Sequence, residues 1–204
     1  MSDFFKQEKT KQPQDIKTSI LTGTASDAFI SILNFHSNTK QDKIIDLTCG
    51  KLYSWKDYEG IFTNVTYIDK IDYRYNVVGD YTNLDYDKEF DIIYFDPPYF
   101  FDSKFVNCKE RNEQYGDNTQ TYDELMTLIE TSPVFIKRYL KDNGKLILKC
   151  QDQFFKEENK YYPLSLYWQN SFIEKGYDLI DLYIYDNRRI SPTAYQVKNI
   201  LNFN

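Results

Sequence analysis

Residues 90–99 read FDIIYFDPPY, and this stretch decides the fold class. Its first six residues form a short, mostly apolar run of the kind found in strands that are buried on both faces of a sheet. Asp96 follows directly, and the two prolines after it remove two backbone donors and stiffen the turn. The stretch therefore predicts a buried strand whose carboxyl end presents an acidic side chain on a rigid loop.

Comparable runs elsewhere in the chain, each bounded by turn residues, predict further strands. In all, strands are expected at 43–48, 64–69, 75–80, 90–95, 145–150, 178–185 and 195–203.

Helix start and stop signals lie between most of these strands. The Ser-Asp pair at 26–27 is expected to cap a first helix, and the segment 121–124, TYDE, is a capping box that opens a second. The Ser-Pro pair at 132–133 is expected to restart that second helix, and the Asn-Gly pair at 143–144 to end it. A third helix is expected at 163–175, closed by a glycine.

Strands that alternate with helices favour a parallel α/β sheet. The last two expected strands have no helix between them, so they should pair antiparallel as a C-terminal hairpin. Residues 1–14 are polar and charged and predict a flexible arm, whereas 15–204 contain no linker and predict a single domain.

Composition excludes several classes of protein. The chain has 204 residues, of which 41% are hydrophobic, which rules out a wholly disordered chain. No stretch approaches the roughly 18 apolar residues of a membrane span, and the N-terminus has no signal-peptide core, so a cytoplasmic protein is expected. The net charge of −6 argues against non-specific coating of nucleic acid. One histidine and three widely spaced cysteines argue against a Cys/His zinc site, so difficult chemistry would need carboxylates or a cofactor.

Four expected strands end in an acidic residue: Asp46, Asp69, Asp80 and Asp96. Ligands of open α/β sheets bind at the carboxyl ends of the strands, so these carboxylates should surround one crevice.

The segment 46–50, DLTCG, combines a strand end, an acid and a glycine turn that lets a backbone approach a nucleotide-like cofactor, although an ordinary strand-to-helix turn would have the same pattern. Asp69 follows Asp46 by 23 residues, close to the spacing of an acid that binds ribose hydroxyls. Asp80 suits an adenine amino group, with simple strand termination as the alternative.

The Asp-Pro-Pro-Tyr turn offers acceptors for an amino group. With two backbone donors removed, the Asp96 carboxylate and the Pro97 carbonyl can each accept an N–H of an exocyclic NH2 group, which draws the nitrogen toward tetrahedral geometry and frees its lone pair. Tyr99 offers a flat face for an extruded base. A double-proline turn with a helix-capping Asp is the plain alternative.

Together and in this order, these features resemble the class I S-adenosylmethionine-dependent methyltransferases that modify amino groups of nucleobases. The turn at 96–99 matches the catalytic motif of adenine-N6 DNA methyltransferases and of related guanine-N2 RNA methyltransferases. DLTCGK at 46–51 with Trp55, LILKCQD at 146–152 and VKN at 197–199 are similar to small phage and prokaryotic DNA methylases. The resemblance implies a Rossmann-like, mostly parallel sheet of seven strands with helices on both faces.

The resemblance also implies the site residues and S-adenosylmethionine as the cofactor. The catalytic set is Asp96, Pro97, Pro98 and Tyr99, and the cofactor set is Thr22, Gly23, Asp46, Thr48, Gly50, Asp69 and Asp80. One departure stands out, since the family usually has a second glycine two residues after the first, where this chain has Leu52.

A separate target-recognition domain of the usual length is absent from the sequence, so substrate choice is expected to come from the 100–120 loop, the N-terminal arm, the hairpin at 186–196 or a partner, with Gln151 at the rim of the sheet. Basic residues mixed with aromatic ones suit phosphates and splayed bases, although a solvated loop would look similar. The candidates are Phe100, Lys104, Arg111, Tyr115, Gln151, Arg188 and Arg189.

The expected function is methyl transfer to an exocyclic amine of a base, with adenine N6 in DNA favoured over cytosine N4 and over guanine N2 in RNA. The missing glycine and recognition domain keep open a non-catalytic or regulatory subunit of a methyltransferase assembly. Methylation of a protein side-chain amide ranks third, because related enzymes of that kind usually carry Asn in place of Asp96. Nucleic acid is the expected partner, a second subunit or a homodimer is left open, and no membrane is expected.

Overall fold

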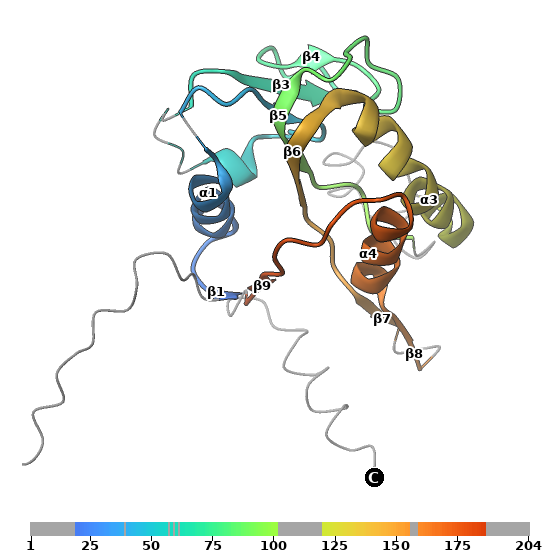
Figure 1. The fold of residues 1–204 in the computed structure, drawn as a ribbon. Coiled ribbons are helices and arrows are strands. Elements are labelled where there is room, and N and C mark those ends of the chain that lie inside the picture. The colour runs from blue at the N-terminus through green and yellow to red at the C-terminus, as the bar shows by residue number, and fades with distance from the viewer. Residues whose placement is uncertain are drawn as a thin grey trace, which may run out of the picture.

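A five-stranded parallel sheet forms the centre of the protein (Figure 1). The computed structural model describes residues 19–38, 40–56, 58, 60, 62–101, 120–155 and 159–186. The strands of the sheet are β2 (Ile44–Asp46), β3 (Val65–Asp69), β4 (Val77–Val78), β5 (Phe90–Phe95) and β6 (Leu140–Leu148). Their spatial order is β4-β3-β2-β5-β6 and every pairing is parallel. The chain thus starts in the middle of the sheet at β2, moves outward to β4 and returns to β5 on the other side of β2. The strand order reverses between β2 and β5, so the carboxyl ends of these two strands form the switch point of the sheet.

Helices cover both faces of this sheet. The helices are α1 (Ala25–His36), α3 (Tyr122–Tyr139) and α4 (Leu164–Glu174), with a short 3-10 helix, η1 (Tyr53–Trp55), after β2. Figure 1 shows α1 on one side of the sheet and α3 with α4 on the other. The alternation of side chains along each strand explains this division, because successive residues point to opposite faces.

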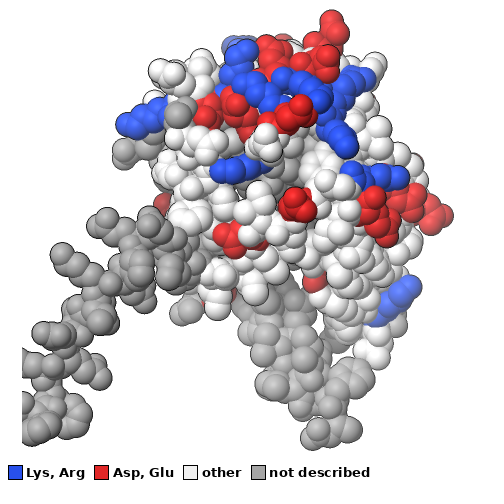
Figure 2. All heavy atoms as spheres, viewed as in Figure 1, with Lys and Arg blue, Asp and Glu red and all other residues white. Residues whose placement is uncertain are grey.

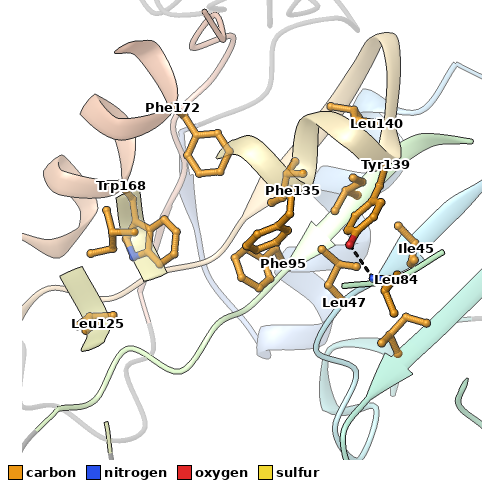
Figure 3. Packing of buried hydrophobic residues seen from close by; sticks show 14 of the residues in the cluster. Ile45, Leu47, Leu84, Phe95, Leu125, Phe135, Tyr139, Leu140, Trp168 and Phe172 are labelled. Carbon is orange, nitrogen blue, oxygen red and sulfur yellow. Dashed lines mark hydrogen bonds between the residues drawn. The ribbon is translucent and has the colours of Figure 1, made fainter. Parts of the chain in front are cut away.

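Two buried clusters result from that alternation. Ile44 and Ile92 pack with Phe29 of α1, whereas Ile45 and Ile93, one residue further along, belong to the cluster under α3 and α4. Figure 3 shows the second cluster, in which Phe95 of β5 faces Phe135 of α3, with Trp168 and Phe172 of α4 beside them. Burial of these large apolar side chains on both faces is the main force that holds the strands in one layer.

Two small sheets lie beside the central one. Strand β1 (Ile20–Leu21) pairs parallel with β9 (Ile184–Tyr185), and β7 (Gln153–Phe155) pairs antiparallel with β8 (Lys160–Tyr162). The first of these brings together two segments from opposite ends of the described chain (Figure 1).

The parallel α/β architecture with helices on both faces is confirmed, but the expected count of seven strands in one sheet is wrong for the residues described. The long strand expected at 178–185 shrinks to Ile184–Tyr185, and it pairs parallel with β1. Leu179, Ile180 and Leu182 are exposed, so burial does not hold this segment against the sheet. Its expected hairpin partner at 195–203 lies outside the described residues, and the antiparallel pair near the C-terminal end is β7–β8.

The first helix begins two residues earlier than expected. Its N-cap is Thr24, whose hydroxyl accepts a 3.0 Å hydrogen bond from the Asp27 backbone N–H, while the Asp27 carboxylate accepts one of 3.0 Å from the Thr24 N–H. Ser26, the expected cap, is buried and its hydroxyl donates to the Ser54 carbonyl. Asp27 therefore caps as the third residue of a capping box.

The second helix is continuous through Pro133, so the expected restart there is wrong, whereas the capping box of Thr121 and Glu124 is confirmed. Proline cannot donate to the carbonyl of Ile129 one turn earlier. The hydroxyl of Ser171 on α4 donates to that carbonyl instead, at 2.7 Å, which explains why the helix is not interrupted.

The helix ends at Tyr139, before the expected Asn-Gly stop. Leu140 already pairs with Phe90, and the next paired residues are Lys145 and Ile92. The Asn-Gly pair at 143–144 therefore lies in an irregularity within β6, with Asn143 at φ 62°. The Asn-Gly pair marks a break in the pairing of β6 and not the end of the helix.

Among the described residues, no helix combines the length and apolarity that crossing a membrane requires.

Candidate active site

Three of the four expected acidic residues meet at the carboxyl edge of the sheet, around the switch point. Asp46 ends β2, Asp69 ends β3 and Asp96 follows β5. Backbone hydrogen bonds continue past the strands: the N–H of Leu47 donates to the Tyr94 carbonyl at 3.0 Å and that of Cys49 to the Ile68 carbonyl at 3.0 Å. The strand-end loops are thus held side by side.

Asp46 is the most deeply buried carboxylate of the site. Its Oδ2 accepts a 2.7 Å hydrogen bond from the indole Nε1 of Trp55, and its Oδ1 accepts one of 2.9 Å from the backbone N–H of Thr48. Burial raises the pKa of Asp46 to about 7 although both hydrogen bonds act to lower it, and the charges of Asp96 and Asp69 raise it further. Both carboxylate oxygens are therefore used to shape the loop.

Thr48 joins the loop after β2 to the Asp-Pro-Pro-Tyr turn. Its hydroxyl accepts a 2.9 Å hydrogen bond from the backbone N–H of Asp96. The two segments that the sequence assigned to cofactor and target amine are thus in direct contact.

Asp96 is paired with a lysine on the neighbouring strand. Oδ2 of Asp96 lies 2.5 Å from Nζ of Lys149, which follows the end of β6. Burial raises the pKa of Asp96, and the Lys149 cation acts against that rise.

The turn after Asp96 is held by two glutamine side chains. The amide of Gln120 donates to the carbonyl of Pro98, and that of Gln153 on β7 donates to the carbonyl of Tyr99. The Pro97 carbonyl accepts no hydrogen bond from the residues that the structure describes. A role of this carbonyl as an acceptor for a ligand stays a prediction.

The glycine loop keeps an open backbone face. Gly50 has φ 48°, and a Cβ placed on it would meet no heavy atom within 4 Å. Its N–H donates to Oδ2 of Asp69 at 3.0 Å, and the Tyr75 hydroxyl donates to its carbonyl at 2.5 Å. The loop therefore has room for a ligand beside a fixed backbone.

Leu52 occupies the position where the resembled family usually has a second glycine. It has φ 57° and ψ 31°, in the left-handed region that glycine adopts most easily. Its side chain packs against the buried cluster that contains Phe29 and Trp55. The loop thus makes its turn at residue 52 without a glycine.

Asp69 and Asp80 differ in their surroundings. Oδ1 of Asp69 accepts from the Ile71 N–H at 2.9 Å, so this carboxylate organises the loop after β3. Asp80 is held by Thr82 and by Lys70, whose Nζ lies 3.3 Å from Oδ2. Although partial burial acts in the opposite direction, these contacts hold the pKa of Asp80 below its usual value. No described contact joins Asp80 to the other three carboxylates, so it lies at the margin of the cluster.

Thr22 and Gly23 connect β1 to α1. The hydroxyl of Tyr185 on β9 donates to the Gly23 carbonyl at 3.1 Å, and Gly23 has φ 109°. Strand β9 therefore fixes the segment that the resemblance assigns to the cofactor.

Most of the expected substrate contacts fall outside the described residues, namely Lys104, Arg111, Tyr115, Arg188 and Arg189. Of the others, Phe100 lies with its ring centroid 4.8 Å from that of Tyr99, and Gln151 is exposed beside the site. Figure 2 shows basic and acidic side chains intermingled over the upper part of the viewed face, without a separate basic stripe. A role of Phe100 and Gln151 in substrate binding stays a prediction.

Three contacts of the site were not predicted from the sequence: Trp55 with Asp46, Lys149 with Asp96, and Tyr75 with Gly50. Trp55 and Lys149 stand in the motifs that carry the resemblance, but nothing local marks what they touch. Tyr75 is one of 19 tyrosines and has no distinguishing signal in the sequence.

A scan against protein-family models finds no match for this chain, and a search of the curated proteins finds none either.

Proposed function

We propose that the protein is an S-adenosylmethionine-dependent methyltransferase that modifies an exocyclic amino group of a nucleobase, with adenine N6 in DNA as the first candidate. The observation that carries the proposal is the meeting of Asp46, Asp69 and Asp96 at the switch point of a parallel sheet ordered β4-β3-β2-β5-β6. Ligands of open α/β sheets bind at such points. The Asp-Pro-Pro-Tyr turn stands at that same point.

The loop residues fit a nucleoside-containing cofactor. The Gly50 backbone has open space beside it, and Asp69 ends the strand next to it with a carboxylate that can accept from ribose hydroxyls. Gly50, Asp69 and the Thr22-Gly23 segment would hold S-adenosylmethionine, whose sulfonium supplies an electrophilic methyl group when bound.

Asp96 and Pro97 would bind the target amine. Oδ1 of Asp96 and the Pro97 carbonyl are two acceptors for the two N–H groups, since Lys149 holds only Oδ2. Accepting a hydrogen bond from each N–H draws the nitrogen toward tetrahedral geometry and frees its lone pair for attack. A strong base is unnecessary, because the proton can leave after transfer.

The two described cysteines are poor candidates for a covalent route. Burial raises the pKa of Cys49 and of Cys150 to about 12, so neither thiol ionises near neutral pH. Direct transfer to an amine held by the turn is the simpler reaction for this site.

The test is transfer of labelled methyl from S-adenosylmethionine to mixed DNA and RNA by the wild type, Asp96→Ala and Asp91→Ala. Asp91 lies on β5, the strand that leads to Asp96, and pairs with Lys141 away from the site, so its variant is a matched control that should retain transfer. Asp96→Ala should abolish transfer while cofactor binding, measured by calorimetry, survives.

Equal labelling by the wild type and Asp96→Ala would contradict the proposed role of Asp96. Label in RNA guanine in place of DNA would select the guanine-N2 alternative. No label in either polymer, with activity restored by a second protein, would select the regulatory subunit.

A further inference from the structure

We infer that Lys149 is a positioning residue of this site, which holds one oxygen of Asp96 so that the other is presented to the amine of the substrate. The inference rests on the proposed function and adds a residue to which the sequence assigned no role.

The geometry fixes the Asp96 carboxylate from two sides. On one side, the Thr48 hydroxyl accepts from the Asp96 N–H at 2.9 Å, which sets the backbone. On the other, Lys149 Nζ lies 2.5 Å from Oδ2, which sets the side chain. Oδ1 accepts no hydrogen bond within the described part of the chain, so it is the oxygen left for a ligand.

The backbone of Lys149 is itself anchored. Leu148 pairs with Phe95 in the parallel ladder, and the Lys149 N–H donates to the Phe95 carbonyl at 2.9 Å. The two charged residues therefore leave adjacent strands at the same level. A contact set by the ladder in this way is not an accidental meeting of two flexible surface side chains.

The other titratable groups near Asp96 do not offer it a cation. Asp46 at the end of β2 is a second carboxyl group, which is neutral or negative, Tyr94 of β5 is neutral and buried, and Cys150 follows Lys149 as a neutral thiol. Lys149 is thus the cation that faces Asp96 among the described residues.

Removal of this cation has a defined chemical consequence. Without Lys149, a partly buried carboxylate beside Asp46 takes up a proton at higher pH. A protonated carboxyl carries an O–H donor where the amine needs an acceptor, so binding of the amine weakens. An amide at position 96 carries no charge, so the Asp96→Asn variant should not need the cation.

The experiment measures kcat/KM for methyl transfer to the DNA or RNA that the wild type labels, from about pH 5 to about pH 9.5. The variants are Lys149→Met, Lys149→Arg, Asp96→Asn and the double variant Asp96→Asn with Lys149→Met. For Lys149→Met, the acidic limb should move up by about one to three pH units and activity should return at high pH. Lys149→Arg keeps the charge and should stay close to the wild type, while the double variant should match Asp96→Asn.

A purely structural role predicts a different pattern. Lys149→Met would then lower kcat/KM by the same factor at every pH, or would lower it as much in the Asp96→Asn background as in the wild type. Either result overturns the inference. If Asp96→Asn is inactive, the shift of the limb in Lys149→Met against Lys149→Arg decides the question. Circular dichroism checks that each variant is folded, and Lys149→Gln replaces Lys149→Met if the latter does not fold.

Failure of the proposed function gives a separate result. A wild type that labels neither polymer overturns both proposals. A wild type that transfers methyl, with a pH profile unchanged in Lys149→Met, overturns the inference alone. Titration of the Asp96 carboxyl carbon by NMR in the wild type and Lys149→Met gives a second reading without catalysis, in which an unshifted titration also overturns the inference.

Discussion

Trp55 and Asp46 are joined by a 2.7 Å hydrogen bond from the indole Nε1 to the Oδ2 of a carboxylate that is 1% exposed. The bond closes the loop between β2 and η1, since the same carboxylate also accepts from the Thr48 N–H. Phe29 of α1 packs on the Trp55 ring, with centroids 4.8 Å apart. One side chain thus connects the strand end, the glycine loop and the first helix.

Trp55→Phe should destabilise the protein more than the same change at Trp168. Both indoles are buried, but the Trp168 Nε1 has no hydrogen-bond partner in the described part of the chain, so its loss removes no bond. A hydrogen bond to a charged group contributes about 1.5–3 kcal/mol, and Trp55→Phe should cost about that much more than Trp168→Phe. Urea unfolding of both variants at about pH 8 measures the difference. Equal losses would mean that the bond to Asp46 contributes little.

The stability of the protein should fall as pH rises toward 7, through Asp46. Its pKa in the folded state is about 7 because of burial, above the value of 3.8 for an unperturbed aspartate. Between these two pKa values, the folded state holds a proton that the unfolded chain has released. The stabilisation is therefore complete below the unfolded pKa of 3.8 and is lost as the pH rises to the folded pKa of about 7. The expected slope is up to about 1.4 kcal/mol per pH unit.

The check is urea unfolding of the wild type and Asp46→Asn at several pH values between about 4 and 8. Asp80 and Asp91 have lowered pKa values and act in the opposite direction, but they do so in both proteins. The difference in free energy of unfolding between the two proteins therefore reports Asp46 together with its electrostatic coupling to Asp96 and Asp69. Parallel curves would show that Asp46 stays ionised in the folded state.

Most strands of the central sheet were predictable because a strand that is buried on both faces is a short run of consecutive apolar residues. Short apolar runs that end in an acid located β2, β3 and β5, and the same runs placed Asp46, Asp69 and Asp96 at one edge. Strand β6 was found only in part. Its first residue, Leu140, pairs with Phe90 before a shift in register, and the sequence shows only the turn signal at 143–144.

Contacts between distant residues were not predictable in the same way. Ser171 of α4 donates the hydrogen bond that Pro133 of α3 cannot donate. Lys149 contacts Asp96, from which it is 53 positions away in the sequence. Segment 178–183 has strand-like composition, but its apolar side chains are exposed and composition alone did not show that. Leu52 shows a further limit, because a residue type that disfavours a left-handed backbone adopts it where packing holds it.

Gly50→Ala should weaken both cofactor binding and the fold, whereas Gly176→Ala should weaken the fold alone. Gly50 has φ 48° and Gly176, after α4, has φ 86°, and a Cβ at either position meets no atom within 4 Å. An alanine at each position should therefore cost only backbone strain, about 1–2 kcal/mol. If the cofactor approaches the Gly50 backbone, only Gly50→Ala should also lower affinity for S-adenosylmethionine, by about tenfold or more. Calorimetric titration of both variants with S-adenosylmethionine tests this. Equal affinities of Gly50→Ala and Gly176→Ala would show that the cofactor does not approach the Gly50 backbone.

Ser171→Ala should destabilise the protein, and Pro133→Ala should remove most of that effect. The Ser171 hydroxyl is the donor to the Ile129 carbonyl at 2.7 Å, because Pro133 has no N–H to offer. Ile129 is buried, so loss of the donor leaves an unsatisfied carbonyl at a cost of about 1–3 kcal/mol. An alanine at 133 supplies the missing N–H, so the same Ser171→Ala change should cost much less in that background.

Urea unfolding of the two single variants and the double variant gives the coupling energy, with Ser132→Ala as the control. The Ser132 hydroxyl also donates to a helix carbonyl, that of Leu128, but the helix backbone itself supplies a donor to that carbonyl. The loss of stability in Ser132→Ala should therefore be smaller than in Ser171→Ala, and it should not depend on whether Ser171 is present. Additive losses for Ser171→Ala and Pro133→Ala would show that the Ile129 carbonyl finds another donor, and that the continuity of α3 through its proline comes from packing alone.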